Sequence, residues 1–340
     1  MTSKTLLACA ALLLGGPLAA HSASQESFLE APAGAGLLKG TLLTPSSPPM
    51  STVLIVPGSG PTDRDGNSPL GVKASTYRLL AEGLAARGVA TLRIDKRGLY
   101  ASATAAADAN AVTIPDYVDD VNAWIAVLRK QTGAPCVWVL GHSEGGLVAL
   151  AAAKQAPGLC GLILVSAPGR PLGEVLRSQL KANPANAPLL EEALPAIDKL
   201  ERGEHVDTTG MHPALLRLFG PSIQGFLISA LSYDPARLVA DVSKPVLVLQ
   251  GQSDLQVGEG DARLLKQADP RAELALLPGV NHVLKLVPAD DRRANLAAYA
   301  DPSLPLAPGV VDTIARFLAG AAPPATDTSR ASAASTAAPS

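Results

Sequence analysis

The sequence predicts an α/β protein with a mostly parallel sheet, flanking helices and an inserted helical region. Short apolar segments bounded by Gly or Pro alternate with longer segments of helical periodicity, which is the pattern of strands and crossover helices. The expected strands are almost wholly apolar, which is typical of strands buried on both faces of a parallel sheet. About 80 residues lie between two of them, from Val165 to Val246, whereas a crossover needs about 20 to 30. This interval therefore predicts an insertion.

Each element follows from its own local pattern. Strands are expected in the apolar runs at 37–43, 52–56, 89–94, 137–140, 162–165, 246–249 and 273–277. Helices are expected between them at 76–87, 116–130, 144–155, 261–267 and 309–319. Inside the insertion, four shorter helices are expected at 173–180, 189–201, 212–218 and 223–232, with prolines between them. We interpret the insertion as a helical cap above the carboxyl edge of the sheet.

Composition and charge exclude several classes of protein. Hydrophobic residues make up 47% of the chain and charged residues 17%, with a net charge of -2. Such a chain can bury a sizeable core and is not a disordered polyelectrolyte. It has no basic stripe that would neutralise phosphates, so nucleic acid is not expected as a partner.

The first 23 residues have the features of a secretory signal peptide. Lys4 precedes an apolar run from Leu6 to Leu14, and small residues follow. An apolar run this short does not span a bilayer, which needs roughly 20 residues, so no stable membrane anchor is expected. We predict cleavage near residues 20 to 24 and a secreted or periplasmic location.

The chain is thus divided by composition. Small and polar residues at the two ends predict segments that cannot bury enough apolar surface to order themselves. The expected units are a signal peptide at 1–23, a flexible segment at 24–35, the first part of the core at 36–169, the helical cap at 170–240, the second part of the core at 241–320 and a disordered tail at 321–340.

An apolar strand runs directly into a helix through Gly141-His-Ser-Glu-Gly145. This G-x-S-x-G turn places Ser143 at a strained strand-to-helix corner, where the two glycines allow close packing. Backbone N–H groups and the helix dipole at this corner favour developing negative charge. Ser143 is therefore the candidate nucleophile; the alternative is a plain glycine-rich turn.

A serine nucleophile needs a base that is oriented by a carboxylate. Asp254 follows a buried strand at the edge where open α/β sheets bind ligands, and it is the candidate acid, with Glu259 and Asp261 as substitutes. His282 follows the next strand and is the candidate base. The remaining histidines are set aside by position: 21, 142, 205 and 212.

Acyl transfer also needs hydrogen-bond donors for the oxyanion. One is expected from the backbone N–H of Glu144, the residue after the nucleophile, and the other from the N–H of Ser59, with Gly60 second. The loop lacks the Gly-Lys-Ser/Thr ending of a phosphate loop. The charged run Asp63–Asp65 that follows is either an ion-paired loop or a solvated turn.

With these residues in place the chain resembles the α/β-hydrolase superfamily over roughly residues 36 to 320, and within it the capped exported carboxylesterases and the serine aminopeptidase-like hydrolases. The motifs that carry the resemblance are LKGTLLTP, GSGPTDRDGN, GHSEGG, GQSD and GVNH, in that order. The resemblance implies an α/β-hydrolase fold.

The sequence predicts a secreted or periplasmic serine hydrolase that cleaves short to medium acyl carboxylic esters through an acyl-enzyme, with neither metal nor cofactor. The expected partner is a small-molecule ester, and the oligomeric state is left open. Peptide cleavage at an N-terminal residue is an alternative, for which Glu144 and acidic residues of the cap would bind the free amine. A thioesterase and a catalytically idle binding module are further alternatives.

Two expectations concern individual side chains. Cys136 and Cys160 open consecutive strands that should be neighbours, which predicts a disulfide; two buried thiols are the alternative. Apolar residues of the cap are expected either to wall a closed acyl pocket or to pack the cap itself. These residues are Leu176, Leu180, Leu215, Leu218, Phe219, Phe226 and Leu227.

Overall fold

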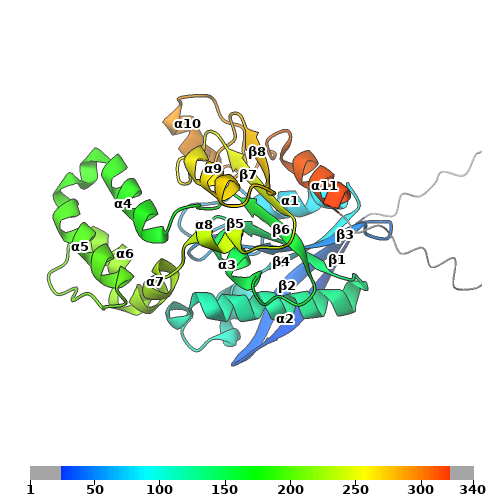
Figure 1. Ribbon diagram of the computed structural model, residues 1–340, viewed down its shortest axis with the longest axis horizontal. Coiled ribbons are helices and arrows are strands. Elements are labelled where there is room, and N and C mark those ends of the chain that lie inside the picture. The colour runs from blue at the N-terminus through cyan, green and yellow to red at the C-terminus, as the bar shows by residue number, and fades with distance from the viewer. Residues whose placement is uncertain (1–23, 322–340) are drawn as a thin grey trace, which may run out of the picture.

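The computed structural model describes residues 24–321 and shows a single mixed sheet with helices on both faces (Figure 1). The strands are β1 (Gln25–Ala33), β2 (Gly36–Thr44), β3 (Ser51–Val56), β4 (Val89–Ile94), β5 (Val137–His142), β6 (Leu159–Val165), β7 (Val246–Gly251) and β8 (Glu273–Leu277). Their order in the sheet is β1-β2-β4-β3-β5-β6-β7-β8. The strands β3 to β8 are all parallel to one another. The hairpin of β1 and β2 is antiparallel, and β2 runs antiparallel to its other neighbour, β4. The predicted mostly parallel sheet is confirmed.

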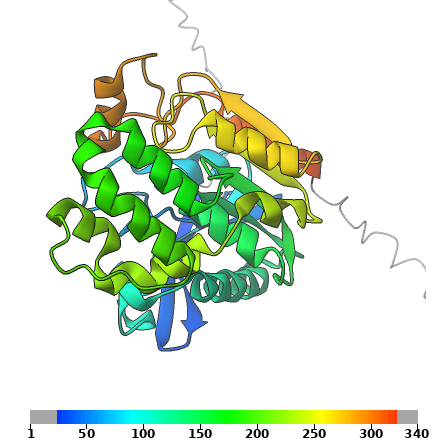
Figure 2. The ribbon, with the colours of Figure 1, turned by 60° about the vertical axis from the view of Figure 1, so that its left-hand side comes forward.

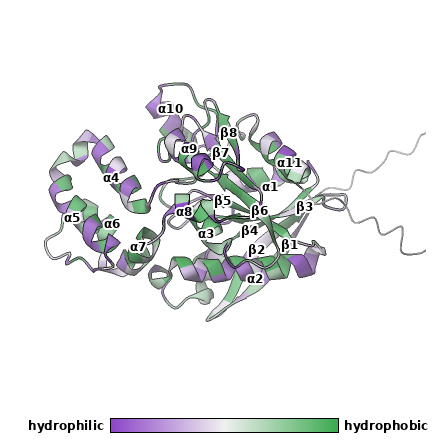
Figure 3. Cartoon of the chain, in the orientation of Figure 1, coloured by the Kyte–Doolittle hydropathy of each residue, from purple (hydrophilic) through white to green (hydrophobic). Residues whose placement is uncertain are grey.

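Helices cover the two faces of the sheet unequally. The helices are α1 (Thr76–Ala85), α2 (Ile114–Thr132), α3 (Glu144–Ala152), α4 (Leu172–Ala182), α5 (Leu190–Glu201), α6 (Pro213–Phe219), α7 (Gln224–Leu231), α8 (Pro235–Ala240), α9 (Glu259–Ala268), α10 (Arg292–Ala297) and α11 (Val310–Ala321). Helices α1 and α11 share one apolar cluster with the sheet, while α2, α3, α8 and α9 share another on the opposite side. Figure 3 shows the apolar strands between these layers. Burial on both faces explains why the central strands are apolar throughout.

The predicted flexible segment at 24–35 is wrong, because most of it is strand β1. Its nine residues pair with β2 along their whole length, from Gln25 opposite Thr44 to Ala33 opposite Gly36. Only Ala31 is fully buried, although Leu29 also packs on the core. An edge strand is held mainly by its backbone ladder, so a polar composition does not prevent it from forming.

Helices α4 to α7, with the turns that join them, form the insertion (residues 172–231), which lies to one side of the sheet in Figure 1 and in front of it in Figure 2. It has an apolar cluster of its own, in which Ile197, Leu200 and Phe219 are fully buried. The stretch Pro213–Leu231 is long and apolar enough to cross a membrane by length and composition alone. Here it folds as α6, a short turn and α7, and it contributes Leu215 and Phe219 to that cluster.

Two predictions about the chain ends concern residues outside those that the structure describes. These are the signal peptide at 1–23 and the tail, of which only Ala321 is described, as the last residue of α11. The boundaries of the cap stay a prediction. Helix α8, which follows the insertion, returns to the main core and buries Leu238 and Val239 there.

The predicted disulfide between Cys136 and Cys160 is confirmed. Cys136 immediately precedes β5 and Cys160 is the second residue of β6, so the bond joins neighbouring parallel strands near their amino ends. Their Cα atoms are 5.1 Å apart, with 24 residues of sequence separation. A loop of this length corresponds to about 3 kcal/mol of stabilisation in the chain-entropy description.

Candidate active site

Ser143 lies at a strained corner between β5 and α3. Its φ is 54° and its ψ is -121°, a conformation that non-glycine residues rarely adopt. The flanking glycines are required by close backbone packing. A Cβ at Gly141 would lie 2.2 Å from the carbonyl oxygen of Gly145, and one at Gly145 would lie 2.3 Å from that of Val56. The local sequence therefore fixes a half-buried serine at the carboxyl edge of the sheet, where it lines a cavity.

The structure brings Asp254 and His282 together from the loops after β7 and β8. The His282 Nδ1 lies 2.8 Å from the Asp254 Oδ2. The other carboxylate oxygen of Asp254 accepts the backbone N–H groups of Gln256 and Val257 at 2.8 and 3.0 Å. Burial raises the pKa of Asp254, but the charge and hydrogen bond of His282 and these two N–H bonds outweigh it, so the pKa is lowered. Asp254 is thus held as a carboxylate.

The substitute acids are engaged elsewhere. Glu259 accepts hydrogen bonds from Gln252 and Arg263. Asp261 is buried and forms an ion pair with Arg170. Of the three candidate carboxylates, Asp254 is the one bonded to His282.

A cavity of about 160 Å³ opens over these residues. Ser143, His282 and Ser59 all line it, so the predicted nucleophile, base and oxyanion donor face one space. Glu144 begins α3 directly behind Ser143, which places its backbone N–H at the helix amino end. The structure gathers all five predicted site residues at one edge of the sheet, and their catalytic roles stay predictions.

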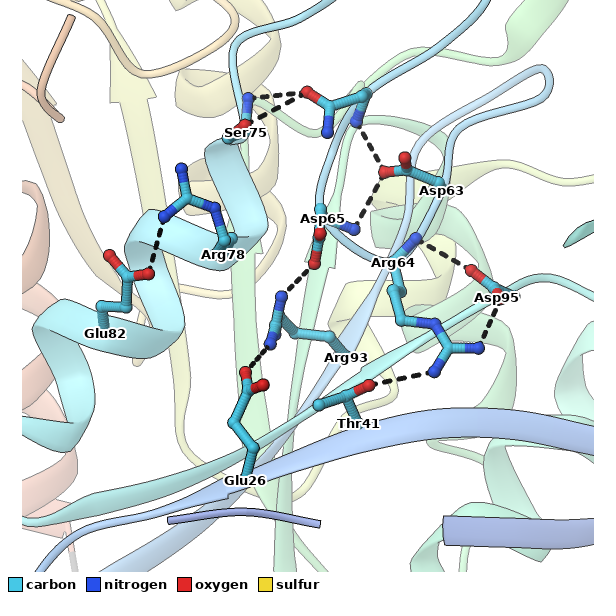
Figure 4. A network of polar contacts seen from close by, with 11 residues as sticks. Glu26, Thr41, Asp63, Arg64, Asp65, Ser75, Arg78, Glu82, Arg93 and Asp95 are labelled. Atoms are coloured by element: carbon cyan, nitrogen blue, oxygen red, sulfur yellow. Dashed lines mark hydrogen bonds and ion pairs between the residues drawn. The ribbon is translucent and has the colours of Figure 1, made fainter. Parts of the chain in front are cut away.

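The loop that carries Ser59 is fixed by ion pairs (Figure 4). Arg64 pairs with the buried Asp95, which follows β4. Asp65 pairs with the buried Arg93 of β4, and Arg93 also contacts Glu26 of β1. Of the two interpretations of this charged run, the ion-paired loop is confirmed.

His142 is not one of the predicted site residues, yet it lines the same cavity and connects two of the loops around it. Its Nε2 lies 2.9 Å from the backbone carbonyl oxygen of His282, which can only accept, so Nε2 donates. Its Nδ1 therefore accepts the hydroxyl of Tyr77 at 2.9 Å, and the Tyr77 oxygen accepts the Gly58 N–H at 2.9 Å. Burial, with a smaller effect of the neighbouring His282, lowers the pKa of His142 to about 3, so the ring is neutral. The base loop and the oxyanion loop are thereby connected.

Lys96 and Glu144 form a second buried connection that sequence reasoning missed. The Lys96 Nζ donates to the Gly58 carbonyl oxygen at 2.7 Å and lies 3.7 Å from the Glu144 Oε1. Burial lowers the pKa of Lys96 and raises that of Glu144, each partly offset by the other's charge. The one sequence feature that could have indicated this pair is Glu144, the only charged residue of the otherwise apolar helix α3.

A second cavity of about 280 Å³ lies between the oxyanion loop and the insertion. Lys96, Glu144 and Tyr117 line its polar side, and Phe226 of α7 lines its apolar side. Phe226 is the only one of the seven predicted wall residues that lines this cavity. The other six pack within the insertion: Leu176, Leu180, Leu215, Leu218, Phe219 and Leu227. Of the two interpretations, packing of the cap itself holds for these six residues, because they form the apolar core of the insertion.

Residues 24–321 contain no group of three or more His, Cys, Asp and Glu side chains that could hold a metal ion. The remaining described histidines have local partners. His205 bonds to Gln224, and His212 accepts the Ala214 N–H at the start of α6.

Comparison with known proteins adds to this geometry. A family model described as serine aminopeptidase, S33, matches residues 70–286. An esterase of Thermotoga maritima, EstD, is 29% identical over 266 residues, which is 76% of this chain and 61% of that relative. The chain thus spans less than two thirds of the length of this relative.

Solved structures are similar over most of the chain. A proline iminopeptidase of Mycobacterium smegmatis has a TM-score of 0.56 at 20% identity, covering 87% of this chain and 98% of its own. A thermophilic esterase of Thermogutta terrifontis has a TM-score of 0.53 at 18% identity, covering 88% and 100%. At these identities the likeness establishes the α/β-hydrolase fold.

Proposed function

The chain belongs to the serine aminopeptidase S33 family of α/β hydrolases, and from this premise we propose that it is an exported serine esterase. Its substrates are short to medium acyl carboxylic esters, which it cleaves through an acyl-enzyme intermediate. The observation that carries the proposal is the His282 Nδ1–Asp254 Oδ2 bond of 2.8 Å beside a cavity that Ser143 also lines.

In this proposal the Ser143 hydroxyl attacks the ester carbonyl. Asp254 accepts the Nδ1–H of His282, which leaves the Nε2 lone pair free to take the serine proton and to return it to the departing alcohol. The lowered pKa of Asp254 keeps its charge available to stabilise the imidazolium that forms. Water then releases the acid by the same proton transfers.

The oxyanion of each tetrahedral intermediate accepts the backbone N–H groups of Ser59 and Glu144. Such donors contribute most when they are aimed in advance at the developing charge. The ion pairs of Arg64 and Asp65 support this role, because they hold the loop that carries Ser59. The Glu144 N–H is aimed by its position at the start of α3.

Charge favours an ester over a peptide with a free amino end. In the peptide alternative, the Glu144 carboxylate is one of the groups, beside acidic residues of the cap, that would bind a substrate ammonium group. Glu144 already has Lys96 beside it, at 3.7 Å, so an incoming ammonium would meet a site whose charge is balanced. The EstD relative is named an esterase, which also supports ester cleavage.

The sizes of the cavities favour short acyl groups. The two cavities measure about 160 and 280 Å³, below the range of roughly 300 to 1,000 Å³ that is usual for drug-sized ligands. Each further methylene that finds room contributes about 0.8 kcal/mol, so activity should rise with chain length and then fall. We expect the optimum at about four to eight carbons.

Export is supported by the Cys136–Cys160 disulfide. Disulfides persist in oxidising compartments and are rare in the cytosol. The bond therefore agrees with the signal peptide that the sequence predicts at residues 1–23.

The test is a substrate panel on the purified mature protein: p-nitrophenyl esters of two to sixteen carbons, aminoacyl p-nitroanilides and an acyl thioester. Esters of four to eight carbons should have the highest kcat/KM. An optimum at twelve carbons or more, or activation on emulsions, would make the protein a lipase. A preference for aminoacyl amides or for thioesters would identify the corresponding alternative, and failure of Ser143 to react with a fluorophosphonate would leave an idle binding module.

A further inference from the structure

The two peptide groups on either side of Gly58 are each held by one buried side chain. Ser59 lines the cavity and its N–H is the proposed oxyanion donor, while the carbonyl of the same peptide group belongs to Gly58. That carbonyl oxygen accepts the Lys96 Nζ at 2.7 Å. On the other side of Gly58, its own N–H donates to Tyr77 at 2.9 Å. The plane of the Gly58–Ser59 peptide is therefore fixed by side chains outside the loop.

Lys96 is built into this place. Its side chain is 6% exposed and comes from the segment just after β4, behind the oxyanion loop. A buried ammonium group is costly unless partners compensate it. Its polar partners are the Gly58 carbonyl and the Glu144 carboxylate, and its Nζ also lies over the Tyr117 ring, 5.8 Å from the centroid. Each of these two residues adjoins one proposed oxyanion donor: Gly58 shares a peptide group with the Ser59 N–H, and Glu144 carries the second N–H itself.

Peptide chemistry gives this arrangement a consequence. A cation bonded to a peptide carbonyl polarises the whole group and strengthens its N–H as a donor. The same bond fixes the direction of the N–H before substrate arrives, which is the condition under which an oxyanion donor is effective.

We propose that Lys96 is a positioning residue of the oxyanion hole, which orients and polarises the Gly58–Ser59 peptide and ties it to Glu144. This inference rests on the proposed serine-hydrolase function. It assigns Lys96 no proton transfer, and it is separate from the place that Lys96 has in the wall of the 280 Å³ cavity.

The central test compares Lys96→Met with the double variant Lys96→Met/Glu144→Gln. Lys96→Met removes the bond to Gly58 but leaves the Glu144 carboxylate buried without its cation. The double variant removes both charges and still lacks the bond to Gly58. If Lys96 only neutralised Glu144, the double variant would regain activity. If it acts on the peptide, kcat stays about 10- to 100-fold low in both variants, less than the 10²- to 10³-fold loss of a whole oxyanion donor.

A transition-state analogue separates positioning from a general loss of structure. A trifluoromethyl ketone forms a tetrahedral oxyanion on Ser143, so its affinity should fall in parallel with kcat. Lys96→Arg keeps a cationic donor and should recover part of both.

The matched control is the neighbouring buried pair. Arg97 bonds to the Asp120 carboxylate and to the Asp116 carbonyl, with side chains that are 12% and 6% exposed for Arg97 and Asp120. Arg97→Met/Asp120→Asn should lower the melting temperature and leave kcat within about twofold of the wild type. Melting curves of all variants show which ones are folded.

Rates of fluorophosphonate labelling keep the two proposals apart. Phosphonylation of Ser143 also places an oxygen in the oxyanion hole, so its rate tests Lys96 even when no ester is turned over. Labelling without ester turnover would overturn the esterase proposal alone. A folded double variant with wild-type labelling, kcat and analogue affinity would overturn the role of Lys96.

Discussion

The rings of His142 and His282 lie next to each other, with centroids 4.8 Å apart. Their hydrogen-bond partners determine which of the two can exchange a proton with substrate. Both nitrogens of His142 are engaged, one with Tyr77 and one with the His282 carbonyl. His282 has one nitrogen engaged, with Asp254. Only His282 therefore keeps a nitrogen with which it can exchange a proton with substrate.

The proposed roles of Ser143, His282 and Asp254 predict how much activity is lost when each is replaced. Ser143→Ala and His282→Ala should each abolish measurable turnover. Asp254→Asn should lower kcat by roughly 10⁴, because the amide favours the wrong imidazole tautomer. Steady-state rates on a butyrate ester give these numbers, and circular dichroism verifies folding. A near-normal rate for Asp254→Asn, together with a large loss for a Glu259 or Asp261 variant, would move the acid to one of those residues.

The buried, neutral His142 should make the folded protein less stable at acidic pH. Its pKa is lowered to about 3 by burial, while the unfolded chain has a histidine pKa of about 6.5. Below pH 6.5 the unfolded state binds a proton that the native state does not, so stability falls with pH down to about 3. The wild type should lose about 2 kcal/mol more than His142→Gln between pH 7 and pH 5.

Gln is chosen because its amide can both accept from Tyr77 and donate to the His282 carbonyl, yet does not titrate. Urea unfolding at several pH values gives the free energy of unfolding of the wild type and of His142→Gln. Other titrating groups contribute equally to both proteins and cancel in the difference. Parallel curves for the two proteins would show that His142 titrates normally.

At the scale of elements, helix α7 is the part of the insertion that carries Phe226 into the wall of the 280 Å³ cavity. Phe226 packs edge-on against Tyr117, with ring centroids 6.3 Å apart, and reaches the main core, whereas Phe219 of α6 is fully buried within the insertion. These two aromatic residues lie seven positions apart but belong to different cores.

Phe226→Ala should therefore change substrate length. Removing the ring enlarges the 280 Å³ cavity, and two further methylenes at about 0.8 kcal/mol each would raise kcat/KM for esters two carbons longer by roughly tenfold. Phe219→Ala should instead destabilise the protein by about 3 to 5 kcal/mol with no shift of the optimum. The p-nitrophenyl ester series measures both effects. An unchanged optimum in a folded Phe226→Ala protein would show that acyl chains do not occupy this cavity.

For the whole molecule, the sequence predicted the elements that depend on local pattern. The apolar runs indicated the strands from β2 to β8, and the G-x-S-x-G turn indicated Ser143. The connections behind the site depend on residues far apart in sequence: 38 positions separate Lys96 from Gly58, and 65 separate Tyr77 from His142. No local pattern indicates such pairs. β1 was missed because its stability comes from pairing with β2, not from its own composition.

That edge strand predicts the effect of truncation. Removing residues up to Ala33 would leave the edge of β2 unpaired and take Glu26 away from the buried Arg93. The truncated protein should melt at a lower temperature and associate through the exposed edge. Glu26→Gln is the control: its side chain is 52% exposed, so the cost should stay below about 1 kcal/mol. Equal melting curves and monodisperse elution of the truncated protein would contradict this prediction.

The pairing of β6 with β7 has an evolutionary consequence. These strands are direct neighbours, with Leu162 opposite Val246, although the whole insertion lies between them along the chain. Closing a connection costs free energy only with the logarithm of its length, about 0.6 kcal/mol per doubling. Natural selection can therefore lengthen, shorten or replace helices α4 to α7 as a cassette while the sheet keeps its register. Substrate range can diverge between descendants of this gene without rebuilding the hydrolytic machinery.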